Sequence, residues 1–260
     1  MELPRNSFKA MLATTPAFGC WVGLGDAYGA ELIATTGFDW LVIDGEHAPN
    51  TVRSILDQLR AVEPYRAAPI VRSVNQDPAL IKQLLDIGAR TLMVPMVDTP
   101  EQAAAIVAAM RYAPGGMRGM AAGAIRADRW GSIVGYADHA EESLCLVAQI
   151  ESRTGVENAA AIAATDGVDA VFIGPYDLSN NLGHRGDANH TVVQTAIAQV
   201  LKAVHAAGKA AGILAPVDAD ADRYAQAGFD FIATGLDVLL LKSAAEAKVA
   251  RHRSAGVPRD

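Results

Sequence analysis

Eight short apolar runs, separated by longer segments with helical patterning, divide this sequence of 260 residues. Runs that lack the alternation of half-exposed strands are typical of parallel strands covered on both faces. Eight such strands, each followed by a helix, predict an α/β fold of the (β/α)8 TIM barrel type, which takes about 250 residues as one domain. We therefore expect a single barrel domain over residues 1–260. The predicted strands are residues 17–22, 39–43, 68–72, 91–94, 144–150, 169–173, 209–213 and 230–234.

The segments between the runs support the same fold. In TTGFDW, DIGART, HAAGKA and QAGFDF a glycine separates a helical segment from the next run, where a left-handed C-terminal cap requires it. A doubly wound sheet is the alternative, but Gly19, Gly23 and Gly25 lack the spacing of a dinucleotide-binding loop. The predicted helices are residues 51–61, 77–87, 99–110, 155–164, 191–206, 218–227 and 237–253.

One connection is much longer than the others. Residues 111–140 separate the fourth and fifth strands and contain several glycines, arginines and aromatic residues. Long barrel connections are usually lids or substrate loops. We expect this one at the end of the barrel where the chemistry takes place.

Composition and charge argue against several classes of protein. Acidic residues outnumber basic ones by 29 to 22 and no basic run occurs, which argues against nucleic acid as a partner. No apolar stretch reaches the roughly 18 residues of a membrane span, and the N-terminus lacks a secretory signal pattern. Cys20 and Cys145 lie in apolar runs and suggest neither a disulfide framework nor a metal cluster. A cytoplasmic protein is expected.

Polar residues follow the apolar runs at the predicted carboxyl ends of four strands. The active site of a barrel lies at these ends, so we expect side chains from separate strands to meet there. For any single residue the alternative explanation is that the rim of a barrel is solvated and therefore polar. The residues are Asp44, Glu46 and His47 after the second run, Arg72 at the end of the third, Gln149 and Glu151 at the fifth, and Gly174, Pro175, Tyr176 and Asp177 after the sixth.

Glu151 and Asp177 are the candidate metal ligands. Each comes directly after a buried strand, and two carboxylates with water and a bidentate substrate form the oxygen-rich shell that Mg²⁺ or Mn²⁺ prefers. The alternatives are a helix cap for Asp177 and a salt bridge with Arg153 for Glu151.

His47 and Arg72 are the candidate catalytic groups. A carboxylate three residues away, that of Asp44, can orient an imidazole and raise its basicity, as a general base requires. A guanidinium at a strand end is costly to bury unless it meets an anion such as an enolate or a carboxylate. The alternatives are a solvent-exposed His47 and a structural pair between Arg72 and a rim acid.

Two further observations narrow the chemistry. GPYDLS, residues 174–179, places backbone N–H groups at the start of a short helix, an arrangement that suits an anion such as a carboxylate. No lysine ends an apolar run. A Schiff-base aldolase needs a lysine at that place, so its mechanism is disfavoured.

Six motifs occur in a fixed order along nearly the whole chain: VIDGEHAP, IVRS, LLDIGARTLMVPMVDTPEQA, RYAPGGMRG, QIES and FIGPYDLS. Together they resemble the class II (metal-dependent) pyruvate aldolases of the HpcH/HpaI family, of the 4-hydroxy-2-oxoheptanedioate or 2-keto-3-deoxy-sugar-acid aldolase type. The resemblance implies a barrel of the phosphoenolpyruvate/pyruvate superfamily. It also implies a lyase that adds a pyruvate-type 2-oxo acid to an aldehyde, a divalent metal ion (Mg²⁺, Mn²⁺ or Co²⁺), and a homo-hexamer, a trimer of dimers that exchange C-terminal helices.

Position by position, the resemblance implies a role for each of these residues. Glu151 and Asp177 match the metal ligands, His47 and Asp44 match the acid–base pair, and Arg72 matches the arginine at the keto oxygen of pyruvate. From sequence alone Asp86 is simply a helix C-terminal residue. The other matches are Gln149 near the metal and its waters, Asp86 reaching a neighbouring subunit's site, Arg126 near the aldehyde, and Trp21 and Leu214 in the pocket wall.

One position departs from the family pattern, and two other functions stay open. Tyr176 stands where many relatives carry a smaller residue such as Ala, so the aldehyde pocket is expected to be narrower or to gain a hydroxyl. The first alternative is a CoA-ester lyase of the malyl or citramalyl type, which shares the carboxylates. The second is a non-catalytic barrel that acts only in binding or assembly.

Overall fold

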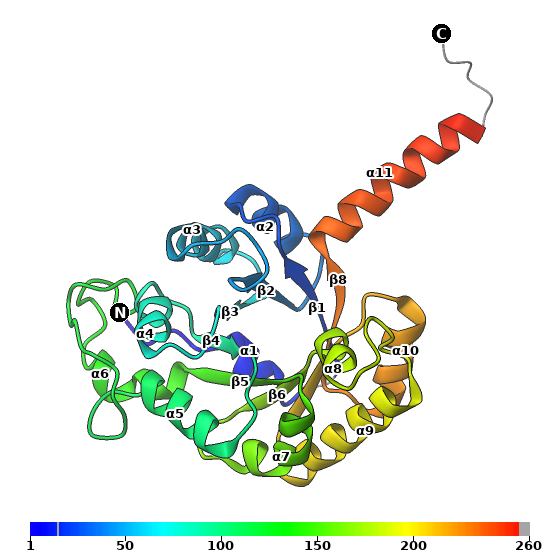
Figure 1. Ribbon diagram of the computed structural model, residues 1–260. Coiled ribbons are helices and arrows are strands. Elements are labelled where there is room, and N and C mark those ends of the chain that lie inside the picture. Colours follow the sequence, from blue (N-terminus) through cyan, green and yellow to red (C-terminus); the bar gives the residue numbers. More distant parts are fainter. Residues whose placement is uncertain (15, 255–260) are drawn as a thin grey trace.

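The computed structural model describes residues 1–14 and 16–254 and contains the predicted closed barrel (Figure 1). Eight parallel strands pair in sequence order, and β1 closes the ring by pairing with β8. Each strand begins and ends within two residues of its predicted run. The strands are β1 (Ala17–Val22), β2 (Trp40–Asp44), β3 (Ala68–Arg72), β4 (Thr91–Val94), β5 (Cys145–Ile150), β6 (Ala170–Ile173), β7 (Ala210–Leu214) and β8 (Phe231–Leu236).

Helices surround the barrel between successive strands (Figure 1). Gly37, Gly88, Gly208 and Gly228 have positive φ angles where helices end, as the four glycine motifs predict. The short α1, α2 and α6 were not among the predicted helices. The helices are α1 (Ser7–Met11), α2 (Ala27–Ala34), α3 (Val52–Val62), α4 (Pro78–Asp86), α5 (Pro100–Met110), α6 (Tyr136–His139), α7 (Arg153–Ala164), α8 (Pro175–Asn181), α9 (Thr191–Ala206), α10 (Asp218–Ala227) and α11 (Asp237–Ser254).

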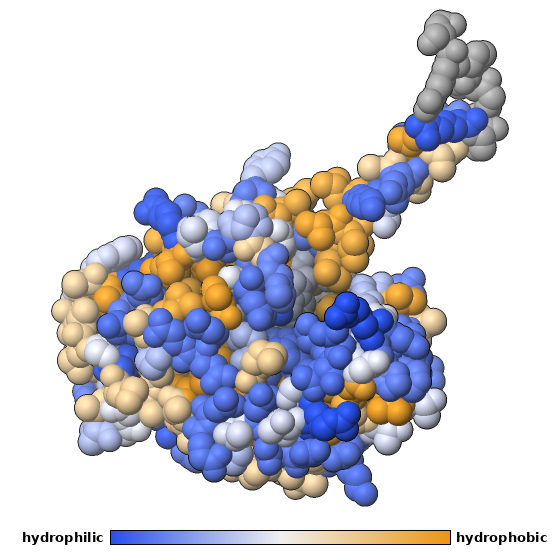
Figure 2. Space-filling view, viewed as in Figure 1, coloured by the Kyte–Doolittle hydropathy of each residue, from blue (hydrophilic) through white to orange (hydrophobic). Residues whose placement is uncertain are grey.

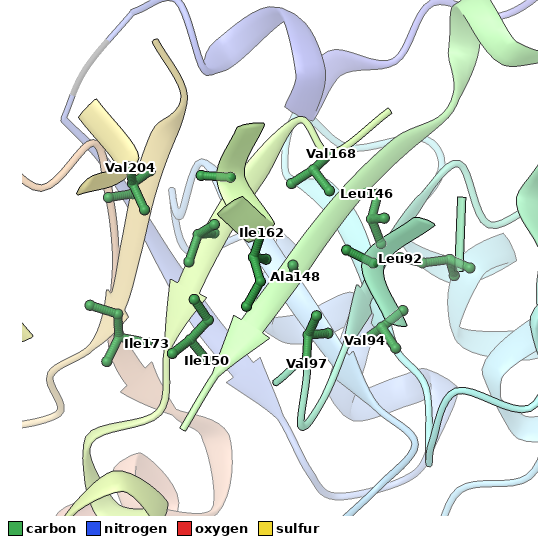
Figure 3. Close-up of a cluster of buried hydrophobic side chains, with 14 of the residues drawn as sticks. Leu92, Val94, Val97, Leu146, Ala148, Ile150, Ile162, Val168, Ile173 and Val204 are labelled. Atoms are coloured by element: carbon green, nitrogen blue, oxygen red, sulfur yellow. The ribbon is translucent and has the colours of Figure 1, made fainter. Parts of the chain in front are cut away.

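The strands are buried on both faces over most of their length, which explains why their sequences do not alternate. One apolar layer lies between the strands and the helices, where Leu146, Ala148 and Ile150 of β5 contribute (Figure 3). A second apolar layer fills the interior of the barrel and includes Val147, the residue between two of these. Successive residues of a strand point to opposite faces, so a strand in this position is apolar throughout.

Aromatic rings fill the interior of the barrel. The rings of Trp40 and Phe231 lie 5.7 Å apart between centroids. A Cβ atom on Gly19 would lie 2.2 Å from the Trp40 ring, and one on Gly212 would lie 2.2 Å from the Phe231 ring. Glycine at these two strand positions therefore makes the space that the large rings occupy.

The N-terminal segment closes the amino end of the barrel. Phe8 of α1 is fully buried and packs edge-on against Phe231 at 5.3 Å and against Trp40 at 6.0 Å. Asn6, the N-cap of α1, donates to the carbonyl groups of Arg90 and Ser143. The helix is thus tied to the strand ends above it as well as packed against them.

The expected position of the long connection was wrong. Residues 111–140 follow α5, so the chain has already returned along the outside of the barrel before this excursion begins. Connections from a helix to the next strand lie at the amino ends of the strands, opposite the end that carries the active site in TIM barrels. The helix at residues 99–110 was predicted, but the position given to the long connection did not follow from it.

The last helix, α11, projects away from the barrel (Figure 1). Val238, Leu239, Leu240 and Leu241 in its first turns are all exposed, and apolar atoms gather at its base (Figure 2). Within the part of the chain that the structure describes, no helix is both long and apolar enough to cross a membrane.

Phe8→Ala is expected to destabilise the protein by about 3–5 kcal/mol, because it empties a fully buried aromatic site in the barrel floor. Urea denaturation measures the free energy of unfolding. Phe18→Ala is the matched control, since Phe18 is 39% exposed and loses less buried area. Equal destabilisation by the two variants would contradict a packing role for α1.

Candidate active site

A cavity of about 280 Å³ opens at the carboxyl ends of the strands. This is the end at which the sequence predicted convergence, and most of the predicted site residues line the cavity. They are Trp21, Asp44, His47, Arg72, Gln149, Gly174, Pro175, Tyr176, Asp177 and Leu214. β1, β2, β3, β5, β6 and β7, or the segments just after them, supply these residues.

A buried ion pair joins β2 to β3 at the floor of the cavity. Asp44 and Arg72 are register partners in the two strands. The Arg72 guanidinium donates through Nε to Asp44 Oδ1 at 2.8 Å and through Nη2 to Oδ2 at 2.6 Å. Burial alone would raise the pKa of Asp44, but the hydrogen bonds and charge of Arg72 outweigh it and hold that pKa below its usual value. Asp44 is therefore ionised at neutral pH.

Arg72 binds a second carboxylate in addition to Asp44. Its Nη1 lies 2.8 Å from Glu46 Oε2. The anion that Arg72 was predicted to need is thus present within the protein, and the structural pairing is formed in this structure. One guanidinium faces two carboxylates, so these three side chains together keep a net negative charge.

The prediction that Asp44 orients the imidazole ring of His47 was wrong in this structure. Both Asp44 oxygens are occupied by Arg72, and Trp21 Nε1 also approaches Oδ2 at 3.3 Å. Asp44 accepts a hydrogen bond from the backbone N of His47 at 3.4 Å instead. The imidazole is largely exposed, and its Nε2 lies 3.8 Å from Glu46 Oε2. Glu46, which had no individual role in the prediction, is the carboxylate nearest the ring.

Glu151 is a buried carboxylate beside the cavity. Its oxygens accept hydrogen bonds from the backbone N of Met96 at 2.9 Å and from Gln149 Nε2 at 2.5 Å. Burial raises the pKa of Glu151 to about 7, and the negative charges of Asp177 and Glu46 add to this effect against the opposing Met96 hydrogen bond. These partners replace the predicted alternative of a salt bridge with Arg153.

Asp177 lies in the first turn of α8, whose N-cap is Gly174. The helix-cap alternative for Asp177 is therefore not what the structure shows. A Cβ atom on Gly174 would lie 2.7 Å from Glu151 Oε2 and 3.1 Å from Gln149 Nε2. Glycine at this position lets the β6–α8 backbone approach the carboxylate closely.

The donor set fits a divalent cation. Glu151 and Asp177 supply oxygen ligands of the kind that Mg²⁺ and Mn²⁺ prefer, and the Oε1 atom of Gln149 is buried without a hydrogen-bond partner among the described residues. The raised pKa of Glu151 also reflects negative charge that a cation would neutralise. Over residues 1–14 and 16–254, three His, Cys, Asp or Glu side chains do not converge on one point, so water or substrate would complete the shell.

Asp86 and Arg126 do not reach this cavity. Asp86 ends α4 and accepts a hydrogen bond from Arg118 Nη2 at 2.8 Å. Arg126 lies in the 111–140 excursion and donates to Glu63 at 2.7 Å and to the Ile87 carbonyl at 3.0 Å. Both residues line a separate groove outside the barrel. The amino ends of the strands, where α4 ends, are the wrong end for a site in the same chain.

Asp237 is a site-adjacent residue that sequence reasoning missed. It lines the cavity, is buried, and accepts hydrogen bonds from the backbone N atoms of Gly23 and Leu24 at 2.9–3.0 Å. It therefore fixes the β1–α2 loop against the start of α11. The signal was available, since Asp237 follows β8 as Asp44 and Asp177 follow or end their own strands.

Comparison with known proteins identifies the family of this chain. Residues 17–244 match the model of the HpcH/HpaI aldolase/citrate lyase family. The chain belongs to this family. A protein of Chromohalobacter salexigens named hydroxypyruvate/pyruvate aldolase is 61% identical over 97% of this chain and 100% of its own. A 4-hydroxy-2-oxo-heptane-1,7-dioate aldolase of Salmonella arizonae is 49% identical over 95% of this chain and 94% of its own.

The fold of this HpcH/HpaI family member is also found in solved structures. A crystal structure of an HpcH/HpaI aldolase/citrate lyase family protein from Burkholderia cenocepacia superposes with a TM-score of 0.92 at 42% identity, covering 95% of this chain and 99% of that one. The predicted family, the barrel and the class of enzyme, a carbon–carbon lyase of the aldolase type, are thus confirmed.

The stability of the metal-free protein is expected to depend on pH through Glu151. The pKa of this group is about 4.5 when unfolded and about 7 when folded, so the folded state binds the extra proton. The stabilisation is present below the lower pKa and is lost as pH rises through the higher one. In EDTA, the free energy of unfolding of the wild type relative to Glu151→Gln should fall between about pH 5 and pH 8. A difference that stays constant over this range would contradict the raised pKa.

Proposed function

We propose that this HpcH/HpaI family member is a metal-dependent pyruvate aldolase. It adds the enolate of a pyruvate-type 2-oxo acid to an aldehyde and, in reverse, cleaves 4-hydroxy-2-oxo acids. The observation that carries the proposal is the arrangement around one cavity of the Glu151 and Asp177 carboxylates, the Arg72 guanidinium and the His47 imidazole. The names of the curated relatives support the same reaction class.

Glu151 and Asp177 are proposed to hold a divalent cation, which is Mg²⁺, Mn²⁺ or Co²⁺. When bound, such a cation supplies Lewis-acid polarisation of the substrate keto oxygen and stabilises enolate charge. Gln149 holds Glu151 in place through the 2.5 Å hydrogen bond and brings a free carbonyl oxygen close to the same site.

The side chains of this protein supply charge and move the proton. Arg72, fixed by Asp44 and Glu46, adds positive charge at the keto oxygen. His47 transfers the proton at C3, and its exposed ring lies where a water molecule can relay that proton to solvent. The backbone N–H groups of residues 174–177 hold the substrate carboxylate.

The walls of the cavity select the aldehyde. Trp21, Leu214 and Pro175 form apolar surface, while Tyr176 is 46% exposed at the rim. A tyrosine at this place narrows the entrance and offers a hydroxyl group, which favours a short, hydroxylated aldehyde over a long dicarboxylic semialdehyde.

The proposal includes a homo-hexamer, a trimer of dimers in which single-domain chains exchange α11. The exposed apolar residues at the base of α11 support such an exchange, because they lack cover within one chain. Asp86 and Arg126, which lie outside the barrel, are proposed to complete the site of a neighbouring subunit, with Arg126 near the aldehyde. The cytoplasm is the proposed compartment.

A CoA-ester lyase remains the alternative that shares these carboxylates. The family description includes citrate lyase, but the citrate lyase beta subunit from Mycobacterium tuberculosis is 20% identical to this chain and shows only the fold. Turnover of malyl- or citramalyl-CoA without turnover of pyruvate would favour that reaction.

Exchange of the C3 protons of pyruvate with deuterated water tests the proposal directly. We expect exchange with Mg²⁺ or Mn²⁺ and its loss in EDTA, because enolisation depends on the cation. His47→Ala should lose most of the exchange while it still binds the metal, which calorimetry can confirm. Exchange that persists in EDTA and is trapped by borohydride would mean that a lysine performs the reaction. No exchange in any metal would point to the CoA lyase or to a non-catalytic barrel.

Subunit mixing tests whether sites are shared between chains. His47→Ala and Asp86→Asn are each expected to be nearly inactive alone, because every site in either variant lacks one of the two side chains. After exchange of subunits, chance pairing should restore about a quarter of the sites with both residues intact. Activity in the mixture that equals the sum of the two separate variants would show that each site is built from one chain.

A further inference from the structure

Gln58 is a polar residue in the buried face of α3. Its side chain is inaccessible to solvent, and its neighbours on that face, Ile55, Leu59 and Val62, are core residues. A buried amide costs free energy unless it is hydrogen-bonded. Its partners therefore show why an amide is present at this place.

The partners of Gln58 lead from the helix to the active site. Gln58 Nε2 donates to Asn50 Oδ1 at 2.6 Å and to the Ser54 carbonyl at 3.2 Å. Asn50 Nδ2 in turn donates to the Asp44 carbonyl at 2.7 Å. This connection, from Gln58 through Asn50 to Asp44, ties the core of α3 to the carboxyl end of β2.

The direction of each hydrogen bond is fixed by chemistry. A carbonyl oxygen only accepts, so Asn50 must present its Nδ2 to Asp44 and turn its Oδ1 toward α3. Gln58 must then present its Nε2, which leaves its own Oε1 buried without a hydrogen-bond partner in the described structure. An unsatisfied buried acceptor is destabilising. Gln58 is thus a residue that stability alone does not favour.

The hydrogen bond between Asn50 and Asp44 joins the two ends of a loop that contains residues of the active site. Residues 45–49 run between Asp44 and Asn50, and they include Glu46 and His47. The His47 ring is largely exposed and is not hydrogen-bonded to Asp44, whose contact is with the His47 backbone. The position of this ring over the cavity therefore depends on the shape of the loop.

We propose that Gln58, acting through Asn50, is a positioning residue that holds the 45–49 loop and thereby places His47 over the cavity. Its effect on turnover rests on the proposed function. Its effect on the loop does not, because the hydrogen bonds join groups of the protein alone.

Gln58→Met separates positioning from stability. Methionine has nearly the same shape and helix propensity, removes the unsatisfied Oε1, and leaves Asn50 Oδ1 bonded to Ser54 Oγ at 2.8 Å. The melting temperature should therefore stay equal or rise. Backbone hydrogen exchange of residues 44–50, followed by mass spectrometry, should accelerate about five- to tenfold. The kcat for pyruvate proton exchange should fall by about the same factor, with the KM nearly unchanged.

Gln194→Met is the matched control. Gln194 of α9 also donates two hydrogen bonds, to the Ala188 carbonyl and to the Tyr224 hydroxyl, and both of these partners lie outside the 44–50 segment. It should leave exchange at 44–50 and kcat unchanged. Unchanged hydrogen exchange at 44–50 in Gln58→Met, or a kcat loss matched by a lower melting temperature, would overturn the proposal. The two proposals can also fail separately. If hydrogen exchange at 44–50 is faster in Gln58→Met but the wild-type protein does not enolise pyruvate, the positioning role is supported and the proposed function is refuted.

Discussion

Closure of eight parallel strands into one ring is the constraint on which this structure depends. A closed parallel ring brings every carboxyl end to the same mouth, so single polar residues that end or follow β2, β3, β5 and β6 meet without any long-range motif. Closure also requires a packed interior. Trp40, Phe172 and Phe231 fill it, and Gly19 and Gly212 yield the space their rings need.

The guanidinium of Arg72 lies among several carboxylates at the mouth of the barrel. Asp44, Glu46, Glu151 and Asp177 gather there, and Arg72 contacts only the first two, so the group as a whole keeps a net negative charge. Two of these carboxylates differ in their pKa: Arg72 holds the pKa of Asp44 below its usual value, whereas burial raises the pKa of Glu151 to about 7. Burial in contact with a guanidinium and burial beside other carboxylates thus give chemically similar groups different pKa values.

The sequence predicted the strands well because burial on both faces leaves a continuous apolar run that needs no knowledge of distant partners. It predicted the cavity residues for a related reason, since a strand end is a local feature. The expected position of the 111–140 excursion was wrong although the helix before it was predicted, because a connection from a helix to the next strand lies at the amino ends of the strands. The sequence prediction also missed the contacts of His47, since hydrogen bonds from Arg72 and Trp21 to Asp44 involve other strands. Gln58 has no sequence signal of its own: a glutamine in an amphipathic helix is usually a surface residue.

The packed amino end of the barrel has a consequence for the order in which molecules bind and leave. Because α1 and the aromatic rings fill the amino end, the interior of the barrel is packed beneath the cavity. Under the proposed function two molecules react in this cavity, and the one bound deeper, beside Arg72 and Glu151, would be the first to enter and the last to leave. In the proposed reaction, a barrel packed at its amino end thus favours ordered binding and release, in which the molecule at the rim covers the molecule bound below it.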